Sequence, residues 1–492
     1  MSDSKITPRD TDYNRWYQDV INAAQLIDSS PVRGCMVLRP NGFALWENIK
    51  SDLDRRFKET GHVNAYFPMF IPQSFLEKEA EHVEGFAKEC ALVTHHRLRA
   101  ADGGGLEPDP NAKLEEPLVV RPTSETIIWH MYGRWIQSYR DLPILINQWA
   151  NVVRWEMRTR PFLRTAEFLW QEGHTAHASE SEAREEAVRM LEVYRDFCYE
   201  TLAVPVVTGV KTATERFAGA EDTYTIEAMM QNGWALQSGT SHFLGQNFAK
   251  AFDVTFQTEN HDSDFVWATS WGVSTRLIGA LIMTHSDDTG LVLPPKVAHT
   301  QIVIVPIWRK AHEQETVLAF ANEVFAKLKS EFRVVIDDRD NMKPGNKYYE
   351  WERKGVPLRL EIGPRDVKNN SVFSARRLDR AKEGIEVNES FTQSIQVKLD
   401  EIQRMMLENA IEQRNSKTHD IQSYNELKDN IGNGGFFIAP WADSAVNEAA
   451  IKEDCKATIR CYPSDRQSEA NGQLCFYSQQ PATHMAIFAR AY

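Results

Sequence analysis

The run from Arg154 to His177 constrains the fold of this chain more than any other segment, because its chemistry alternates with the period of a β-strand. It reads RWEMRTRPFLRTAEFLWQEGHTAH, with Pro161 marking a turn. Side chains in a strand alternate between two faces. The residues that share a face are Arg154, Glu156 and Arg158 before the turn, and Phe168, Trp170, Glu172 and His174 after it. The pattern predicts a β-hairpin that holds a polar ligand against a sheet. A solvated hairpin edge is the alternative, and this segment alone leaves it open.

Length and composition bound the class of protein. The chain has 492 residues, 42% of them hydrophobic, and one core rarely organises so many, so two to three domains are expected. No apolar stretch reaches the length of a membrane span, and the N-terminus lacks a signal-peptide core. The six cysteines are scattered, which fits reduced thiols better than a disulfide framework. These features predict a cytoplasmic protein without membrane contact.

Charge is unevenly distributed along the chain. The net charge is −13, whereas residues 339–382 contain 12 Lys or Arg against 6 Asp or Glu. An acidic protein with one basic module repels polyanions in general but can engage phosphates locally. A solvated, salt-bridged surface is the ordinary alternative.

The order of expected elements divides the chain into three parts. Residues 1–298 mix helices and strands, with an amphipathic helix over 43–61. A buried-strand pattern over 300–307 precedes a helical pattern over 315–332 and more strands, which predicts an α/β domain over 299–400. Helical spacing from Ile395 to Ala410 leads into a third domain over 401–492.

The segment RPTSE, residues 121–125, places the hydroxyl of Thr123 and the carboxylate of Glu125 two positions apart. In an extended loop both would point the same way and could bind an amine together. Thr or Ser followed by Glu is also a common helix N-cap, and both interpretations can hold.

The segment GVSTRLIGAL, residues 272–281, predicts a helix that begins near Ser274 or Thr275, with Arg276 in its first turn. Unpaired amides and the positive end of the helix dipole favour an anion there, and a guanidinium suits phosphate. Arg276 could instead pair with an acidic neighbour. Upstream, a Gly-containing turn that a ligand can approach closely is expected to carry Gln237, Thr240 and His242.

Together these segments resemble the motifs of class II aminoacyl-tRNA synthetases, most closely prolyl-tRNA synthetases of the archaeal and eukaryotic type. RPTSE resembles the TxE loop that binds the amino acid, residues 154–177 resemble motif 2, and GVSTRLIGAL resembles motif 3. The helix and strand through Pro68 resemble motif 1, the dimer-forming element. The resemblance implies an α+β fold: an antiparallel sheet flanked by helices, then an α/β anticodon-binding domain and a small C-terminal α/β domain.

The resemblance also implies roles for individual residues. ATP is expected to bind at Arg154, Glu156, Arg164, Thr165, Gln237, Thr240, Ser274 and Arg276, with Mg²⁺ held through ATP and Gln237. Proline is expected to bind at Thr123, Glu125, Arg154, Trp170, Glu172, His174 and His242. Arg154 and Arg276 are the catalytic candidates. The proline carboxylate itself attacks ATP, so the protein supplies alignment and positive charge rather than a nucleophile.

The implied activity is that of a proline tRNA ligase, a homodimer that forms prolyl-adenylate and transfers proline to the 3′ end of tRNA(Pro). The segment between His177 and Gly239 is too short for a large editing insertion, so no internal editing domain is expected. The basic module matches the anticodon-binding domain. The expected anticodon contacts there are Glu350, Glu352, Arg353, Lys354 and Lys368.

The C-terminal segment departs from the family's pattern of four zinc-binding cysteines. Three ligand positions hold Ala442, Asn447 and Ser478, and only Cys475 remains, so no zinc is expected. A replacement site could be built from Cys455, Cys461, Cys475 and His484, although they do not match the family's ligand positions. Tyr492 matches the family's terminal tyrosine, whose carboxylate is expected to point toward the catalytic domain.

Two rival interpretations remain. A non-catalytic paralogue could bind RNA or a partner through the same fold, but its usual sign is loss of the phosphate-binding arginines or of the TxE pair. The chain retains Arg154, Arg276, Thr123 and Glu125. A class II synthetase for another amino acid is the nearer alternative.

Overall fold

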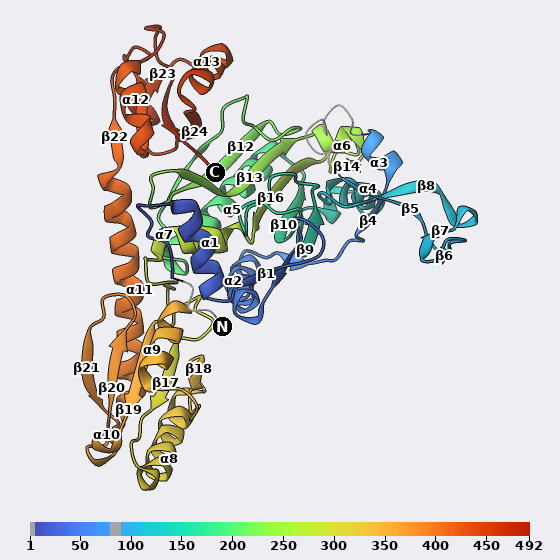
Figure 1. Cartoon of the computed structure of the whole chain (residues 1–492). Coiled ribbons are helices and arrows are strands. Elements are labelled where there is room, and N and C mark those ends of the chain that lie inside the picture. The colour runs from blue at the N-terminus through green and yellow to red at the C-terminus, as the bar shows by residue number, and fades with distance from the viewer. Residues whose placement is uncertain (1–4, 79–89) are drawn as a thin grey trace.

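The computed structural model describes residues 5–78 and 90–492. A central body built on a large sheet lies between two smaller bodies (Figure 1). The long helix α11 (Phe391–Ser416) runs past the central body from one small body to the other. This arrangement confirms the expected fold class, an α+β core followed by two smaller α/β domains. The helix also crosses the expected domain limit at residues 400 and 401 without a break, so the domain limits stay a prediction.

The central sheet is antiparallel over six neighbouring strands, in the order β11, β12, β13, β16, β10, β9. Their bounds are β9 (Ile144–Val153), β10 (Glu167–His177), β11 (Val206–Val210), β12 (Asp222–Met229), β13 (Ala235–Gly245) and β16 (Trp267–Ser274). One face packs against α5 (Glu180–Glu200), whose first turn is capped by Ser179. A Cβ on Gly173 would lie 2.1 Å from the Trp271 ring, so this face is too closely packed to hold a ligand.

The remaining elements of the central body surround this sheet. The helices are α1 (Tyr13–Ala23), α2 (Pro40–Glu59), α3 (Gln73–Lys78), α4 (Glu125–Trp135), α6 (Asn247–Ala251) and α7 (Arg276–His285). The short strands are β1 (Ile27–Ser29), β2 (Met36–Leu38), β3 (Val63–Asn64), β4 (Phe70–Pro72), β5 (Ala91–His95), β6 (Leu98–Ala100), β7 (Leu106–Pro108), β8 (Lys113–Val120), β14 (Thr255–Gln257) and β15 (Ser263–Phe265). Four 3₁₀ helices occur in the described chain: Pro110–Ala112, Tyr139–Asp141, Ile431–Asn433 and Gln467–Ala470.

The expected amphipathic helix is α2, which begins three residues before the expected 43–61 range, at Pro40. Proline at the first helical position costs no hydrogen bond, because that amide has no partner within the helix. The buried face of α2 carries Leu45, Trp46, Ile49, Leu53 and Phe57, at the spacing of one helical stripe.

The second body is a five-stranded sheet in the order β18, β17, β19, β20, β21. Its elements are β17 (Ile302–Pro306), α8 (Ala311–Leu328), β18 (Val334–Ile336), α9 (Pro344–Arg353), β19 (Leu358–Ile362), α10 (Pro364–Lys368), β20 (Ser371–Arg376) and β21 (Lys382–Glu386). Strand β17 lies between two parallel neighbours, and all five of its residues are buried. Its continuous apolar run is therefore the buried parallel strand that the sequence indicates.

The third body extends the central sheet. Its elements are β22 (Thr418–Asp420), α12 (Tyr424–Asn430), β23 (Phe436–Trp441), α13 (Ala445–Cys455), β24 (Thr458–Pro463) and β25 (His484–Ala489). Strand β24 pairs with β11, which joins the two sheets into one of 11 strands. A Cβ on Gly209 would lie 2.5 Å from the carbonyl oxygen of Tyr462, so this contact needs glycine. No helix among the described residues is long and apolar enough to cross a membrane.

Candidate active site

A pocket of about 550 Å³ opens on the face of the central sheet that does not pack against α5. All of the residues expected to bind ATP or proline line it: Thr123, Glu125, Arg154, Glu156, Arg164, Thr165, Trp170, Glu172, His174, Gln237, Thr240, His242, Ser274 and Arg276. They come from segments that lie more than 150 positions apart along the chain. The structure thus assembles the expected residues in one place, while their individual roles stay predictions.

Strand register explains this assembly. On β10, β16 and β13, His174 lies opposite Ser270, and Ser270 lies opposite His242. In the next row, Gly272 stands between Glu172 and Thr240. Residues opposite each other on neighbouring strands share a face. The alternation expected for Trp170, Glu172 and His174 is therefore confirmed, and the central glycine leaves the floor of the pocket open.

The expectation of a turn at Gln237, Thr240 and His242 is wrong, because all three lie within strand β13. Gln237 and Thr240 are three positions apart and would face opposite ways in a regular strand. A register shift places Ile226 opposite Gly239 and Glu227 opposite Gln237, which leaves Ser238 unpaired. This bulge rotates the strand, so both side chains reach the same pocket.

The expectation that Arg154, Glu156 and Arg158 lie on a strand is also wrong, because β9 ends at Val153. The backbone of Arg154 still donates to the carbonyl of Ala166, at 2.8 Å, and the chain then leaves the sheet as a loop. Residues 155–164 follow the shape of this loop rather than strand alternation, because they belong to no strand of the sheet.

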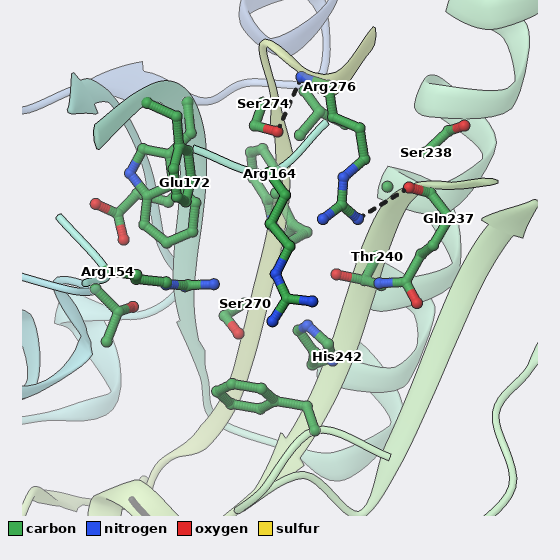
Figure 2. Close-up of a pocket in the computed structure, with 18 of the residues that line it drawn as sticks. Arg154, Arg164, Glu172, Gln237, Ser238, Thr240, His242, Ser270, Ser274 and Arg276 are labelled. Atoms are coloured by element: carbon green, nitrogen blue, oxygen red, sulfur yellow. Dashed lines mark hydrogen bonds between the residues drawn. The ribbon is translucent and has the colours of Figure 1, made fainter. Parts of the chain in front are cut away.

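The loop is held by its own charges. Glu156 accepts hydrogen bonds from the guanidinium of Arg164 and, at 2.8 Å, from the amide of Arg158. Two hydrogen bonds between the backbones of Arg160 and Arg164 close the turn at Pro161. The guanidinium carbon of Arg154 lies 5.5 and 5.4 Å from the ring centroids of Phe168 and Trp170. These cation–π contacts aim Arg154 along the pocket floor (Figure 2).

One end of the pocket is acidic. Glu125 is the first residue of α4 and accepts a hydrogen bond from Thr123. Glu172 accepts from Nε2 of His174 at 2.9 Å, from the hydroxyl of Ser124 at 2.5 Å and from Gln148 at 2.8 Å. Ser124 is the N-cap residue of α4, but its hydroxyl serves Glu172 instead of the helix. Among the described residues, Glu125, Glu172 and His174 form the only group whose possible metal-ligand atoms all lie within 4.8 Å of one another.

The proton affinities of these groups differ. Burial raises the pKa of Glu125. Burial acts in the same direction on Glu172, but the hydrogen bond and charge of His174 outweigh it and lower the pKa of Glu172. The pKa of His174 is raised, because the hydrogen bond to Glu172 outweighs the cost of burying a charged ring. The hydrogen-bonded pair of Glu172 and His174 therefore lies beside the Glu125 carboxyl group, and the acceptor oxygens of the two glutamates suit the N–H groups of an amine.

Arginines occupy the middle and the other end of the pocket. Burial lowers the pKa of Arg154 to about 10, which still leaves it charged at neutral pH. Arg276 begins α7, where its amide donates to the hydroxyl of Ser274 at 3.2 Å. Its guanidinium donates to the carbonyls of Gln237 and Leu163, each at 3.2 Å. Over residues 5–78 and 90–492 Arg276 forms no ion pair with a carboxylate. The structure therefore does not show the alternative in which Arg276 pairs with an acidic neighbour.

Four residues that line the pocket each carry a buried polar atom without a hydrogen-bond partner among the described residues: Trp170 (Nε1), His174 (Nδ1), Ser270 (Oγ) and Trp271 (Nε1). Such atoms are rare in folded proteins unless a ligand completes them. Their clustering indicates that the pocket is built for a polar ligand.

Strand alternation placed Phe168 on the shared face without assigning it a role, and sequence reasoning missed the lining residues Phe217 and Ser270. Ser270 has the same strand parity as Ser274, so alternation was a usable signal for it. Phe217 lies in a loop before β12 and places its ring 4.6 Å from that of His242. No local pattern identifies Phe217, because its position depends on how the loop folds over the sheet. Burial lowers the pKa of His242 to about 3, so its ring is neutral.

The residues expected to contact the anticodon lie in the second body, at the end of α9 and in α10. Glu350 accepts from Arg339 at 3.0 Å and from Lys354 at 2.6 Å, and Glu352 accepts from Arg359 at 2.8 Å. Lys368 is exposed at the end of α10. Most of this set is thus engaged within the body itself. The roles of Glu350, Glu352, Arg353, Lys354 and Lys368 remain a prediction.

The possible replacement metal site does not assemble in the described part of the chain. None of the cysteines in the described residues forms a disulfide. Cys455 donates to the carbonyl of Ile451, whereas Cys475 accepts from the amide of Ser478, and the ring of His484 stacks on Tyr462 at 4.1 Å. Each of these three side chains therefore interacts with a neighbouring group of its own. Whether the protein carries zinc stays a prediction.

Comparisons with known proteins agree along the chain. Residues 109–285 match the family described as tRNA synthetase class II core domain (G, H, P, S and T), residues 301–397 match anticodon binding domain, and residues 424–492 match prolyl-tRNA synthetase, C-terminal. A proline--tRNA ligase from Porphyromonas gingivalis is 58% identical over 494 residues, with 99% of each chain covered. One from Salinibacter ruber is 55% identical over 493 residues, with 100% of each covered.

Solved structures show the same likeness. The crystal structure of a prolyl-tRNA synthetase from Cryptosporidium parvum, complexed with halofuginone and AMPPNP, superposes with a TM-score of 0.91 at 39% identity and covers 99% of both chains. A second structure of that protein, complexed with L-proline and AMP, has a TM-score of 0.90 at 38% identity, with 99% of this chain and 96% of that chain covered.

Proposed function

The chain belongs to the prolyl-tRNA synthetase family, and on that premise we propose that it activates L-proline with ATP and transfers it to tRNA(Pro). The observation that carries this proposal is the division of one pocket into two ends of opposite character. Glu125, Glu172 and His174 form the end for an amine, and Arg164 and Arg276 form the end for phosphates. Arg154 and Arg164 reach into the space between Glu172 on one side and Gln237 and Thr240 on the other (Figure 2).

The reaction needs no nucleophile from the protein. A carboxylate oxygen of proline attacks the α-phosphorus of ATP, the bond to the bridging oxygen breaks, and pyrophosphate leaves with its electron pair. Arg154 stands between the two ends and is suited to bridge the proline carboxylate and the α-phosphate. Arg276 and Arg164 neutralise the departing phosphates. Fixed positive charge of this kind acts where negative charge develops in the transition state.

The remaining contacts orient the two substrates. We assign the adenine to Glu156, with Thr165 beside it, and the ribose to Ser274. The proline ring lies against Trp170 and His242, with its nitrogen toward Thr123 and Glu125. Because Glu172 already accepts three strong hydrogen bonds, we assign it to hold His174 and the Thr123 loop rather than to bind proline alone.

Magnesium fits this pocket. Mg²⁺ prefers oxygen ligands and usually binds through one or two side chains together with substrate phosphates. The amide of Gln237 and the hydroxyl of Thr240 lie together on the wall of the pocket opposite Arg154. When bound there with ATP, the ion supplies additional charge neutralisation at the phosphates. Gln237 is the residue we assign to it.

We further propose three domains, residues 1–298, 299–400 and 401–492, with tRNA recognised by the second. The segment from His177 to Gly239 is filled by α5, β11, β12 and part of β13, which supports the absence of an internal editing domain. Correction of mischarged tRNA then depends on another protein, because a pocket separates ligands that differ by one methylene by only about 1–3 kcal/mol.

A homodimer is proposed from the surface near α2. Exposed apolar side chains occur on α2, on β3 and β4 and between these two strands: Phe43 is 42% exposed, Val63 62%, Tyr66 73% and Phe70 43%. Contiguous exposed apolar side chains mark interaction sites. The absence of disulfides among the described residues supports a reducing, cytoplasmic location.

Amino-acid-dependent exchange of pyrophosphate into ATP tests the function. We expect exchange with proline and no other amino acid at comparable efficiency. Absence of exchange with any amino acid would favour a non-catalytic paralogue, and exchange with a different amino acid would refute the assignment to proline.

A further inference from the structure

A buried group of three charges lies where the third body joins the central sheet. Lys211 directly follows β11, Glu227 lies on β12 and Arg460 lies on β24. Nζ of Lys211 is 2.8 Å from Oε1 of Glu227, and Nε of Arg460 is 3.1 Å from its Oε2. The three residues are 3%, 0% and 7% exposed, respectively. The group therefore connects the two bodies out of contact with solvent.

Such a group is costly to build. Each ion loses its hydration on burial, and well-packed apolar residues of similar size often give equal or greater stability. Here two cations surround one carboxylate, which also accepts from the hydroxyl of Thr225 at 3.1 Å. A need for stability alone does not explain this choice of residues, so a role in the neighbouring site has to be considered.

Glu227 belongs to the face of the sheet that carries the pocket. Thr225 lies opposite Thr240, and Glu227 lies opposite Gln237; both partners line the pocket. The carbonyl of Gln237 accepts the hydrogen bond from Nη1 of Arg276. The Glu227 carboxylate is therefore one strand away from the residue that positions the Arg276 guanidinium.

Arg276 responds to Glu227 through its charge. Burial lowers the pKa of Arg276, and the negative charge of Glu227 is the largest effect that opposes this. Nevertheless, the described structure contains no ion pair between the two. Glu227 accepts hydrogen bonds from Lys211 and Arg460, while the hydrogen bonds of Arg276 in the described structure go to carbonyl and hydroxyl oxygens.

We propose that Arg460 and Lys211 hold the Glu227 carboxylate where it supports the charge of Arg276 without pairing with it, so that Arg276 stays available for the phosphates of ATP. Arg460 is then a positioning residue that the third body supplies to the ATP site. The inference rests on the proposed function, because it takes an ATP phosphate as the partner of Arg276. It also gives the third body a task that does not depend on a metal.

The test compares Arg460→Met with the wild-type enzyme in proline-dependent pyrophosphate exchange. Methionine keeps most of the volume but releases one carboxylate oxygen, which then competes with phosphate for Arg276. We expect the KM for ATP to rise about tenfold, the size of effect of one charge-assisted hydrogen bond, and the KM for proline to stay within about twofold. Arg460→Lys keeps the cation and is expected to restore most of the affinity for ATP.

Two further variants separate positioning from a structural role. Lys211→Met removes the shortest contact of the other oxygen, which keeps hydrogen bonds from Thr225 at 3.1 Å and from Arg460 at 3.3 Å, and it is expected to raise the KM for ATP by a smaller factor. Arg466→Met is the matched control in the third body, because Arg466 pairs only with the exposed carboxylates of Asp420 and Glu469 in the described structure; its KM values should stay at the wild-type level. Thermal melting and active-site titration correct for any unfolded fraction.

The outcomes distinguish the inference from its premise. If Arg460→Met and Lys211→Met lower the melting temperature while the KM for ATP is unchanged, or if the KM values for ATP and proline rise together, the group is only structural and the inference is wrong. If Arg460→Met does not fold, Lys211→Met and Arg460→Lys decide by the same criteria. Absence of proline-dependent exchange in the wild-type enzyme would instead overturn the proposed function.

Discussion

The guanidinium of Arg160 lies over the ring of Tyr492, with its central carbon 5.1 Å from the ring centroid. The last residue of the chain therefore contacts the loop that carries Glu156 and Arg164. The hydroxyl of Tyr492 accepts from Asn232 at 2.8 Å, and its amide donates to the carbonyl of Ala235 at 3.1 Å. In Figure 1 the C-terminus lies beside the central sheet. The direction of its carboxylate remains a prediction.

Removing the Tyr492 ring should weaken ATP binding. A cation–π contact contributes about 0.5–2 kcal/mol, so Tyr492→Ala is expected to loosen the loop and raise the KM for ATP about three- to tenfold. Tyr492→Phe keeps the ring and loses only the bond from Asn232, so its effect should be small. Pyrophosphate exchange at varied ATP concentration measures both. Equal activity of wild type, Tyr492→Ala and a chain lacking Tyr492 would show that this contact has no functional role.

The two ends of the pocket should respond separately to mutation. Glu156 belongs to the loop with Arg164 and lies at the ATP end, so Glu156→Ala is expected to raise the KM for ATP about tenfold with little change for proline. His174 lies at the amine end, so His174→Ala should raise the KM for proline instead. Exchange kinetics with each substrate varied in turn measure both effects.

His177 offers the control for His174. It is buried on the same strand, β10, but belongs to the opposite face, where it contacts Thr175 at 2.8 Å. His177→Ala should lower the midpoint of urea unfolding without changing the KM for proline. If His174→Ala and His177→Ala gave the same kinetic profile, the assignment of His174 to the proline end would be wrong.

The contrast between these residues shows what the sequence can predict. Strand alternation placed Trp170, Glu172 and His174 on one face because β10 is long and regular. It failed for Arg154 to Arg158, where the chain leaves the sheet, and for Gln237 and Thr240, where a bulge changes the parity. The family resemblance predicted that these residues belong to the site, but only the structure shows how their backbones position them there. No sequence pattern indicated Phe217, because its position depends on how its loop packs.

Contacts between the bodies could not be predicted from the sequence either. Residues 209 and 463 pair across the joint between β11 and β24, yet each strand reads as an ordinary apolar segment. The buried pairing of Arg460 with Glu227 joins positions 233 residues apart. Local patterns identify strands, but the choice of neighbours at a sheet edge depends on the packing of the whole chain.

The contact between the second body and the central body should depend on pH. Arg377 donates to both oxygens of Asp287, at 2.8 and 2.7 Å. Burial alone would raise the pKa of Asp287, but the bonds from Arg377 lower it from 3.8 to about 2. A lowered pKa stabilises the folded state above the unfolded value, and this contribution disappears as the pH falls from about 4 toward 2.

Asp287→Asn is therefore expected to lose about 1–2 kcal/mol of stability at neutral pH, allowing for solvent screening of a side chain that is 34% exposed. The difference from wild type should shrink as the pH falls below 4. Urea unfolding at several pH values measures it. Asp288→Asn is the control, because its pair with Arg9 is more exposed and should contribute little. A difference for Asp287→Asn that stayed constant down to pH 2 would contradict the linkage.

Substitution of Lys368 should weaken tRNA binding without changing amino-acid activation. It is exposed at the end of α10, more than 80 residues beyond Arg276 in the chain and in a different body from the pocket. Among the expected anticodon residues, Glu350, Glu352 and Lys354 already form ion pairs, so Lys368 has the most freedom to meet a phosphate or a base edge. Lys368→Ala is expected to lower kcat/KM for tRNA several-fold and to reduce the slope of binding against salt concentration by about 0.7–1. Proline-dependent pyrophosphate exchange should be unchanged.

Lys327→Ala, an equally exposed lysine on α8 of the same body, is the matched control. Equal losses in the two variants would indicate a diffuse effect of charge and no contact at Lys368, whereas a loss of exchange would show that the residue acts on the catalytic body.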